Sequence, residues 1–352
     1  MSDYIGFFVR DNLGQVPNQQ GTCWSSSPDI IFNGTSAQQN PSIYTTANGY
    51  ATDYGSTVFL NTPNFVYLRA LNTNPTVPVT GRAWFYFVES DLALWPNSWR
   101  GFNGDCVNVA GNPVNYQPIT ATANNQVCMA GLPYIWTPPN LASGTHYCAV
   151  SWIDNVPGDP SINPVSTFGY MGSFDNLVAF VLAHPNMGWR NTTDVTGLGL
   201  TWSQTTNITG PSVPGQFNVG VQCTNMPTDG QLGFSIPPPA TGGSGAYFPL
   251  SPIPNPNYQG TVKITDWPAN ATSSITVNYK QGATNPPQGS NIVVTLTTPY
   301  ASLSSETQLA VDRKGADLVS MQHSIDIDPF GRQIIMITPT PVVLIGSQSY
   351  NY

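Results

Sequence analysis

Two acidic side chains and two tryptophans stand close together after a run of aromatic residues. Glu89 and Asp91 follow the segment 81–88, and Trp95 and Trp99 come a few residues later. A flat indole ring can cover the apolar face of a sugar while carboxylates bond its hydroxyl groups. This spacing would suit a glycan-binding loop. The interpretation that we favour is that both indoles pack the loop against the protein core.

The five cysteines are widely spaced along the chain. They form no C-x-x-C pair, so their spacing does not predict a zinc site. Cys106 and Cys128 could close a disulfide around the segment between them, which would suit an extracellular protein. They could equally be buried free thiols, because unpaired cysteine behaves as a small apolar residue. The sequence leaves both interpretations open.

His146 and Cys148 share one face of a predicted strand, because side chains two positions apart point the same way. A thiol nucleophile also needs a lowered pKa and a third group that orients its base. Nothing in the sequence indicates either. We interpret the two residues as core or edge positions of a strand.

Motifs of other catalytic chemistry are missing from the sequence. It holds no glycine-rich phosphate loop, no G-x-S-x-G elbow and no H-E-x-x-H pair. Glu89 and Asp91 remain as candidates for the paired carboxylates of a glycosidase. We predict that the protein is not an enzyme and that it uses neither a metal ion nor a cofactor.

Charged residues are rare in this chain. Of 352 residues, 10 are Lys or Arg and 18 are Asp or Glu, so 8% are charged, where about 25% is typical. The net charge is -8 and no cations are clustered, which argues against a nucleic-acid partner. No apolar stretch reaches the roughly 18 residues of a membrane span, so no membrane insertion is predicted. The chain is rich in Gly and Pro and poor in Glu and Lys, so we expect almost no helix.

Short runs of β-branched and aromatic residues, separated by Pro, Gly and Asn, recur along the whole chain. This pattern is typical of all-β sandwiches. In 81–88 aromatic residues occupy both faces of the strand, which indicates that both faces are covered. Residues 324–327 and 333–337 predict a hairpin, and 342–345 a last strand that completes its own sheet or joins a neighbour's. The other clear strands are 64–71, 145–153, 261–265, 274–279 and 292–297.

A change in composition near residue 195 divides the chain. Beyond it the apolar runs become more aliphatic and less aromatic, and the length allows two domains. We predict two Ig-like or jelly-roll-type β-sandwich domains in tandem, residues 1–195 and 196–352. The first carries a Cys-containing insertion at 101–139, and the second a Pro/Gly-rich loop at 236–256.

The first half resembles the CARDB-type domains, a bacterial group of Ig-like β-sandwiches related to cell-adhesion modules. Residues 23–30 are similar to the group's entry strand, which ends in Ser-Pro-Asp-Ile, and 65–72 to its Val-Tyr-Val-Arg strand followed by Asn. Residues 174–191 resemble its closing strand, which ends in Arg-Asn. The resemblance covers about residues 24–195 and implies a structural or interaction module without catalytic residues. The insertion at 101–139 departs from the group's pattern.

A chain with few charges lacks the charged edge residues, such as lysine, that usually keep exposed strands from pairing with other chains. A surface of Asn, Thr, Ser, Gln and aromatic residues can contact copies of itself with no charge to desolvate. We therefore predict a structural protein that forms homo-oligomers or a larger assembly, such as a filament, a shell or part of a phage-tail-like particle. The alternative is an extracellular adhesin that binds surface glycan through the loop of Trp95 and Trp99.

The first residues of the chain also bear on its location. Residues 1–6 have neither the basic start nor the apolar core of a conventional secretory signal. Particle components can leave a cell by lysis or by a dedicated route. We expect an extracellular or particle-associated protein without a conventional signal peptide.

Overall fold

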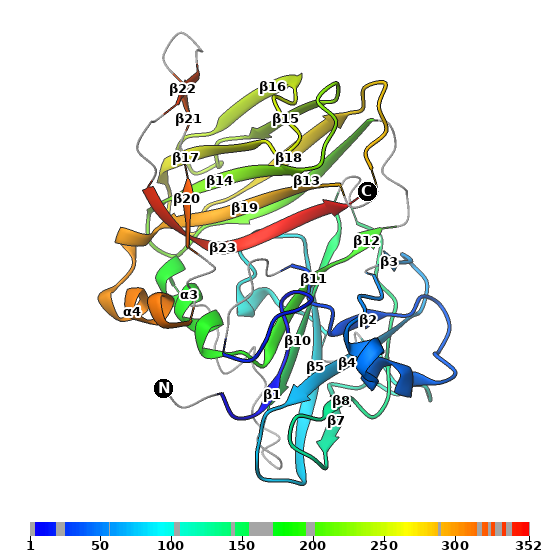
Figure 1. Ribbon diagram of the computed structural model, residues 1–352. Coiled ribbons are helices and arrows are strands. Elements are labelled where there is room, and N and C mark those ends of the chain that lie inside the picture. Colours follow the sequence, from blue (N-terminus) through cyan, green and yellow to red (C-terminus); the bar gives the residue numbers. More distant parts are fainter. Residues whose placement is uncertain are drawn as a thin grey trace.

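Antiparallel sheets make up most of the protein, which is all-β as the composition predicts (Figure 1). Strands before residue 195 build the sheets in the lower part of Figure 1, and strands from residue 201 onward build those in the upper part. The computed structural model describes residues 4–18, 25–55, 57–101, 106–141, 145–154, 172–194, 201–287, 290–314, 319–322, 325–327, 333–335 and 340–351.

One sheet of the first half is organised around β4 (Asn64–Asn72), which matches the strand predicted at 64–71. Four short strands pair with β4 in antiparallel fashion, and β6 pairs with β9. These strands are β1 (Phe7–Phe8), β2 (Ile30–Phe32), β8 (Val127–Met129), β9 (Tyr134–Trp136) and β6 (Cys106–Val107).

The second sheet of the first half has the strand order β11-β10-β5-β7. Its two central strands confirm the strands predicted at 145–153 and 81–88. The bounds are β11 (Met187–Asn191), β10 (Tyr147–Asp154), β5 (Val79–Glu89) and β7 (Tyr116–Ala121). A parallel pair, β3 (Thr57–Val58) with β12 (Thr193–Asp194), lies beside these sheets.

The aromatic residues of β5 are buried on both faces, as its sequence predicts. Phe85 and Phe87 contact Trp136 of the opposing sheet, with ring centroids 5.6 and 4.8 Å apart. Trp84 and Tyr86 point the other way, into a cluster that includes helix α3 (Phe174–Ala183). The sheet therefore separates two apolar layers.

Helix α3 corrects the prediction that residues 174–191 form one closing strand. Apolar residues at 174, 177, 178, 181 and 182 recur at the helical spacing, and Ser173 caps the first turn by accepting a hydrogen bond from Asn176 N at 3.1 Å. Only 187–191 is a strand. The other helical segments are α1 (Ala47–Tyr50), α4 (Ser305–Lys314), and the 3-10 turns η1 (Pro41–Thr45), η2 (Pro96–Ser98) and η3 (Tyr300–Ser302).

Two further sheets face each other in the second half. The first has the order β13-β18-β15-β16: β13 (Thr201–Thr209), β18 (Thr272–Lys280), β15 (Gln231–Ile236) and β16 (Ala246–Pro252). The second has the order β17-β14-β19-β23-β20: β17 (Gln259–Trp267), β14 (Gly215–Thr224), β19 (Asn291–Pro299), β23 (Thr340–Asn351) and β20 (Val319–Gln322).

The C-terminal strand belongs to its own sheet, since β23 lies between β19 and β20. The predicted hairpin is also confirmed, because β21 (Ile325–Ile327) pairs with β22 (Gln333–Ile335). Its loop at 328–332 lies outside the described residues.

Two predicted irregular segments contain regular structure. The insertion at 101–139 supplies β6, β8 and β9 to one sheet and β7 to the other. Within 236–256, residue 236 ends β15, 246–252 is the edge strand β16, and 237–245 and 253–256 are connecting segments.

The two halves meet through a buried seam. Leu92 N and Asn207 O are 3.0 Å apart, and one apolar cluster runs from Trp84 and helix α3 into the sheets of the second half. His146 Nε2 lies 2.5 Å from Gln348 Oε1 of β23. The boundary near residue 195 stays a prediction, and residues 195–200 lie outside the described part of the chain.

Candidate functional site

The structure buries both tryptophans of the predicted glycan loop. Trp95 and Trp99 are each 2% exposed. Their indole nitrogens donate to backbone carbonyls, from Trp95 to Thr209 O at 3.0 Å and from Trp99 to Leu94 O at 3.1 Å. A buried ring cannot stack on a sugar, so the loop packs against the core, which was the interpretation favoured from the sequence.

The two carboxylates of the same loop point to different surroundings. Glu89 is exposed at the end of β5. Asp91 accepts hydrogen bonds from Ala93 N, at 2.9 Å, and from the Thr209 hydroxyl. Burial raises the pKa of Asp91, and its hydrogen bonds oppose that shift. Asp91 thus fastens the loop to β13, and the structure does not combine it with Glu89 and the indoles into a binding surface.

Cys106 and Cys128 are buried free thiols, so the proposed disulfide is not formed. Cys106 lies opposite Trp136, which pairs with Asn64 of β4, whereas Cys128 pairs with Ala70. Asn64 and Ala70 are six positions apart on β4, which corresponds to about 20 Å along the strand. A disulfide needs Cα atoms within about 7 Å, so the sheet register keeps the two thiols apart.

His146 and Cys148 are neighbours without the properties of a nucleophilic pair. The Cys148 sulfur lies 4.0 Å from His146 Nε2 and 3.2 Å from Asn191 Oδ1. Burial raises the pKa of Cys148 to about 12 and lowers the pKa of His146 to about 4. Both groups are therefore neutral at pH 7, whereas catalysis needs a thiolate.

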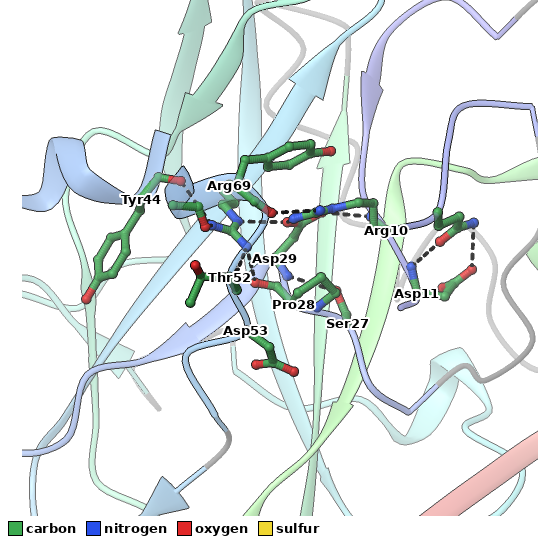
Figure 2. Close-up of polar contacts among 12 residues, drawn as sticks. Arg10, Asp11, Ser27, Pro28, Asp29, Tyr44, Thr52, Asp53 and Arg69 are labelled. Atoms are coloured by element: carbon green, nitrogen blue, oxygen red, sulfur yellow. Dashed lines mark hydrogen bonds and ion pairs between the residues drawn. The ribbon is translucent and has the colours of Figure 1, made fainter. Parts of the chain in front are cut away.

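A network of buried charges holds the first half together (Figure 2). Both carboxylate oxygens of Asp29 are bonded by Arg10, and the Arg69 Nε lies 2.8 Å from Asp29 Oδ1. Asp29 and Arg69 are fully buried. Tyr50 covers the Arg10 guanidinium, 3.4 Å from its ring centroid. A cation–π contact of this kind offsets part of the cost of burial.

The Arg69 guanidinium also donates hydrogen bonds to four backbone carbonyls. Its Nη1 donates to Tyr44 O and Gly49 O, and its Nη2 to Pro28 O and Thr52 O, at 2.7 to 3.1 Å. The segments that resemble the CARDB-type domains contact one another here. Arg190, from the segment 174–191, donates hydrogen bonds to Ser27 O and to the Asp53 carboxylate. Their role in this chain is structural.

This network and a separate ion pair, Arg82 with Asp154, remove charge from the surface. Four of the ten Lys and Arg side chains are buried: Arg10, Arg69, Arg82 and Arg190. Among the described residues, the exposed basic side chains are Arg100, Lys263, Lys280 and Arg313. The outer surface is therefore even poorer in cations than the composition suggests.

An exposed tyrosine marks the outer face of the sheet β13-β18-β15-β16. Tyr247 of the edge strand β16 is 68% exposed and pairs with Ser235 of β15. The row continues to Thr276 and Thr205, whose hydroxyls lie 2.9 Å apart. We call this surface the Tyr247 face: Tyr247, Ser235, Thr276, Thr205, Ser203, Asn278, Asn207 and Ser274.

A hollow of about 390 Å³ opens beside the Tyr247 ring. The turn that forms it is tight, because a Cβ on Gly245 would lie 2.4 Å from Ile236 O. The Ser273 hydroxyl donates to Pro237 O at 2.6 Å and so holds the loop in place. The hollow is lined by Ser235, Ile236, Pro237, Pro238, Gly245, Ala246 and Tyr247.

The sequence interpretation missed both the charge network and Tyr247. A signal existed for the network, because Asp29 and Arg69 stand inside apolar runs, where a charge needs a partner. Tyr247 was assigned to the Pro/Gly-rich loop. The alternation in Ala246-Tyr247-Phe248 was a weak strand signal there.

Comparison with known proteins assigns no family to this chain. No protein family and no curated protein matches the sequence. The CARDB resemblance therefore stays a prediction.

Several solved structures align with the chain at very low similarity. The collagen-binding domain of Erysipelothrix rhusiopathiae surface protein RspB is 10% identical, with 83% of this chain and 93% of that chain covered and a TM-score of 0.19. The collagen adhesin CNA of S. aureus is 8% identical, with 84% and 93% covered and a TM-score of 0.18. A chain from the structure of manganese lipoxygenase of Gaeumannomyces graminis and zonadhesin of Komagataella pastoris is 6% identical, with 92% and 96% covered and a TM-score of 0.19. Such scores do not indicate a shared fold, so the fold class rests on this chain's own sheets.

Within the described ranges, no helix is long and apolar enough to cross a membrane. No group of three or more His, Cys, Asp or Glu side chains in that part of the chain could hold a metal ion.

Proposed function

We propose that this protein is a non-enzymatic structural component that associates with copies of itself or with a larger extracellular or particle assembly. One observation carries the proposal: four of the ten Lys and Arg side chains are held inside the protein, in the ion pairs of Arg10, Arg69, Arg82 and Arg190, so few ions remain on its surface. Patches of surface that lack ions can approach one another without the desolvation of charge.

Proline disfavours association through two of the strand edges. Pro118 stands in the edge strand β7, and Pro249 and Pro252 stand in the edge strand β16. Proline cannot donate to a new ladder of hydrogen bonds. We therefore place the contacts on loops and faces, where large apolar side chains are exposed: Ile5, Leu13, Val16, Val109, Leu132, Val213 and Leu309.

The test is the mass of the purified full chain in solution. Sedimentation velocity over a hundredfold range of protein concentration, with negative-stain electron microscopy of the same samples, should reveal oligomers or regular particles. A monomer of 37.8 kDa at every concentration would contradict self-association.

The adhesin alternative has lost its original basis. It depended on exposed rings at Trp95 and Trp99, and both are buried. A glycan-binding function would need another exposed aromatic side chain.

A further inference from the structure

The geometry points to a binding site for a neutral, hydroxyl-rich polysaccharide on the Tyr247 face, with the Tyr247 ring stacked on one sugar unit. This site is separate from the loop of Trp95 and Trp99. It goes beyond the assembly proposed above, since a single chain carries the whole face.

The Tyr247 ring provides the apolar contact. It is the most exposed of the large apolar side chains in the described part of the chain, at 68%. A sugar that covers an exposed aromatic ring removes apolar surface from water on both partners. The hollow beside the ring has walls of Pro237 and Pro238, and the bond from Ser273 to Pro237 O holds one of them in place. Such a preformed surface loses little entropy when a ligand binds.

The Ser and Thr side chains of the Tyr247 face lie in rows across the strands, and these hydroxyl rows provide the polar contacts. Ser235, Thr276 and Thr205 lie on three successive strands in register with Tyr247, and neighbouring strands are about 4.8 Å apart. All three side chains are half-buried, so they keep access to solvent. A hydroxyl group both donates and accepts hydrogen bonds, as the hydroxyls of a sugar do.

The charge around the face favours a neutral ligand. Lys280 stands at the end of the rows, opposite Thr201 and Gln231. Asp266 reaches the far end of the loop, where it accepts from Ser244 N at 3.1 Å. An anionic polymer would need clustered cations, and the face has no such cluster among its residues.

A protein partner fits this face less well. Hot spots of protein interfaces are rich in Trp, Tyr and Arg and poor in Ser and Thr, whereas Tyr247 is the single aromatic residue in the rows. The prolines of β16 also block the addition of a partner strand at this edge. Sugar hydroxyls, in contrast, can replace the water that now solvates the rows.

Affinity electrophoresis tests the proposal. The full chain is run through gels that contain soluble glucomannan, galactomannan, xyloglucan or dextran, with anionic polygalacturonate as a comparison. We expect at least one neutral polysaccharide to retard the protein. Tyr247→Ala should weaken that binding at least tenfold, and the double variant Thr205→Val, Thr276→Val at least threefold, because both remove contacts and leave the strands in place.

The matched control is Tyr116→Ala. Tyr116 is also an exposed tyrosine on an edge strand, at 39%, but it lies on β7 of the first half. Its replacement should leave retardation unchanged. Circular dichroism confirms that each variant is folded.

Three results would overturn the proposal: no retardation by any neutral polysaccharide, equal retardation of Tyr247→Ala and the unaltered protein, or stronger binding to polygalacturonate. Sedimentation of the same variants separates this site from self-association. Lost glycan binding with unchanged assembly supports the proposal, whereas lost assembly with unchanged glycan binding identifies the face as a contact between copies and overturns it.

Discussion

Asp29 receives two guanidinium groups in a place that water does not reach. Replacement of one partner of a buried ion pair leaves the others without compensation, which costs about 3 to 5 kcal/mol. The carbonyls around Arg69 would remain, but neither arginine would keep its carboxylate (Figure 2). The network therefore stabilises the first half only while Asp29, Arg10 and Arg69 are all present.

We predict that Asp29→Asn lowers the free energy of unfolding by about 3 kcal/mol, measured by urea denaturation. The control is Lys263→Gln, an exposed charge on β17, which should change stability by less than about 0.5 kcal/mol. Equal stabilities of Asp29→Asn and the control would mean that the network contributes nothing.

Trp95 illustrates a second kind of buried residue. Its ring stacks on Phe174 of helix α3 with centroids 5.7 Å apart, and its nitrogen bonds Thr209 O of β13. We predict that Trp95→Ala lowers the free energy of unfolding by about 3 to 5 kcal/mol because it leaves a cavity. The comparison is Tyr116→Ala, an exposed ring, which should cost far less. A stable, soluble Trp95→Ala protein with unchanged denaturation would show that the ring does not support the loop.

At the scale of elements, the seam between β10 and β23 contains a histidine that burial keeps neutral. An unfolded histidine has a pKa of about 6.5, whereas burial lowers the pKa of His146 to about 4. As the pH falls, the unfolded chain takes up the proton first. The stabilisation is therefore complete above about pH 6.5 and is lost progressively as the pH falls towards 4.

We predict that His146→Gln reduces this acid sensitivity. The loss of stability between pH 7.5 and 4.5, measured by urea denaturation, should be smaller in the variant by about 2 kcal/mol. Burial raises the pKa of Asp91 and of Asp154. A raised carboxyl pKa makes the folded state more stable as the pH falls, which is opposite to the effect of His146. Both aspartates are present in the variant and in the unaltered protein, so their effect cancels in the comparison. Burial also lowers the pKa of the less buried His184, so His184→Gln should show the same effect to a smaller degree. Identical pH profiles of His146→Gln and the unaltered protein would contradict the prediction.

Strand β23 is an interior strand of its sheet and also forms part of the seam. Val343 and Ile345 are buried, and Gln348 faces His146. We predict that a chain truncated after Thr340 loses the fold of the second half, seen as loss of near-ultraviolet circular dichroism and early cleavage by protease. A truncated chain that keeps both properties would show that β19 and β20 can close the sheet without β23.

At the scale of the whole molecule, the distribution of charge decides how the protein meets its partners. We predict that any self-association changes less than about threefold in affinity between 50 and 500 mM NaCl, because screening acts only on charged contacts. Sedimentation velocity at both salt concentrations measures this. A tenfold or larger change would assign the contacts to the few exposed ions and contradict a neutral interface.

Much of the fold follows from local pattern. The alternation at 64–71 and 81–88 predicts strands because successive side chains of a strand point to opposite faces, and β4 and β5 confirm both. The resemblance to the CARDB-type closing strand misassigned 174–183, because an apolar run with charged and polar residues at its start fits a closing strand as well as a helix. The Ser173 cap and the spacing of Leu177, Val181 and Leu182 decide for the helix.

The sequence by itself determined the all-β class, the hairpin at 325–335 and the scarcity of charge, since each depends on composition or on spacing within one segment. Only the tertiary structure decided which side chains are accessible. Trp95 is buried and Tyr247 is exposed on an edge strand, whereas the sequence left the place of Trp95 open between a binding loop and the core and assigned Tyr247 to a loop. Cys106 and Cys128 are separated by sheet register, and Asp29 finds Arg10 and Arg69 from distant segments. Burial and pairing are properties of the faces that non-adjacent strands present to one another, and no local pattern specifies which faces meet.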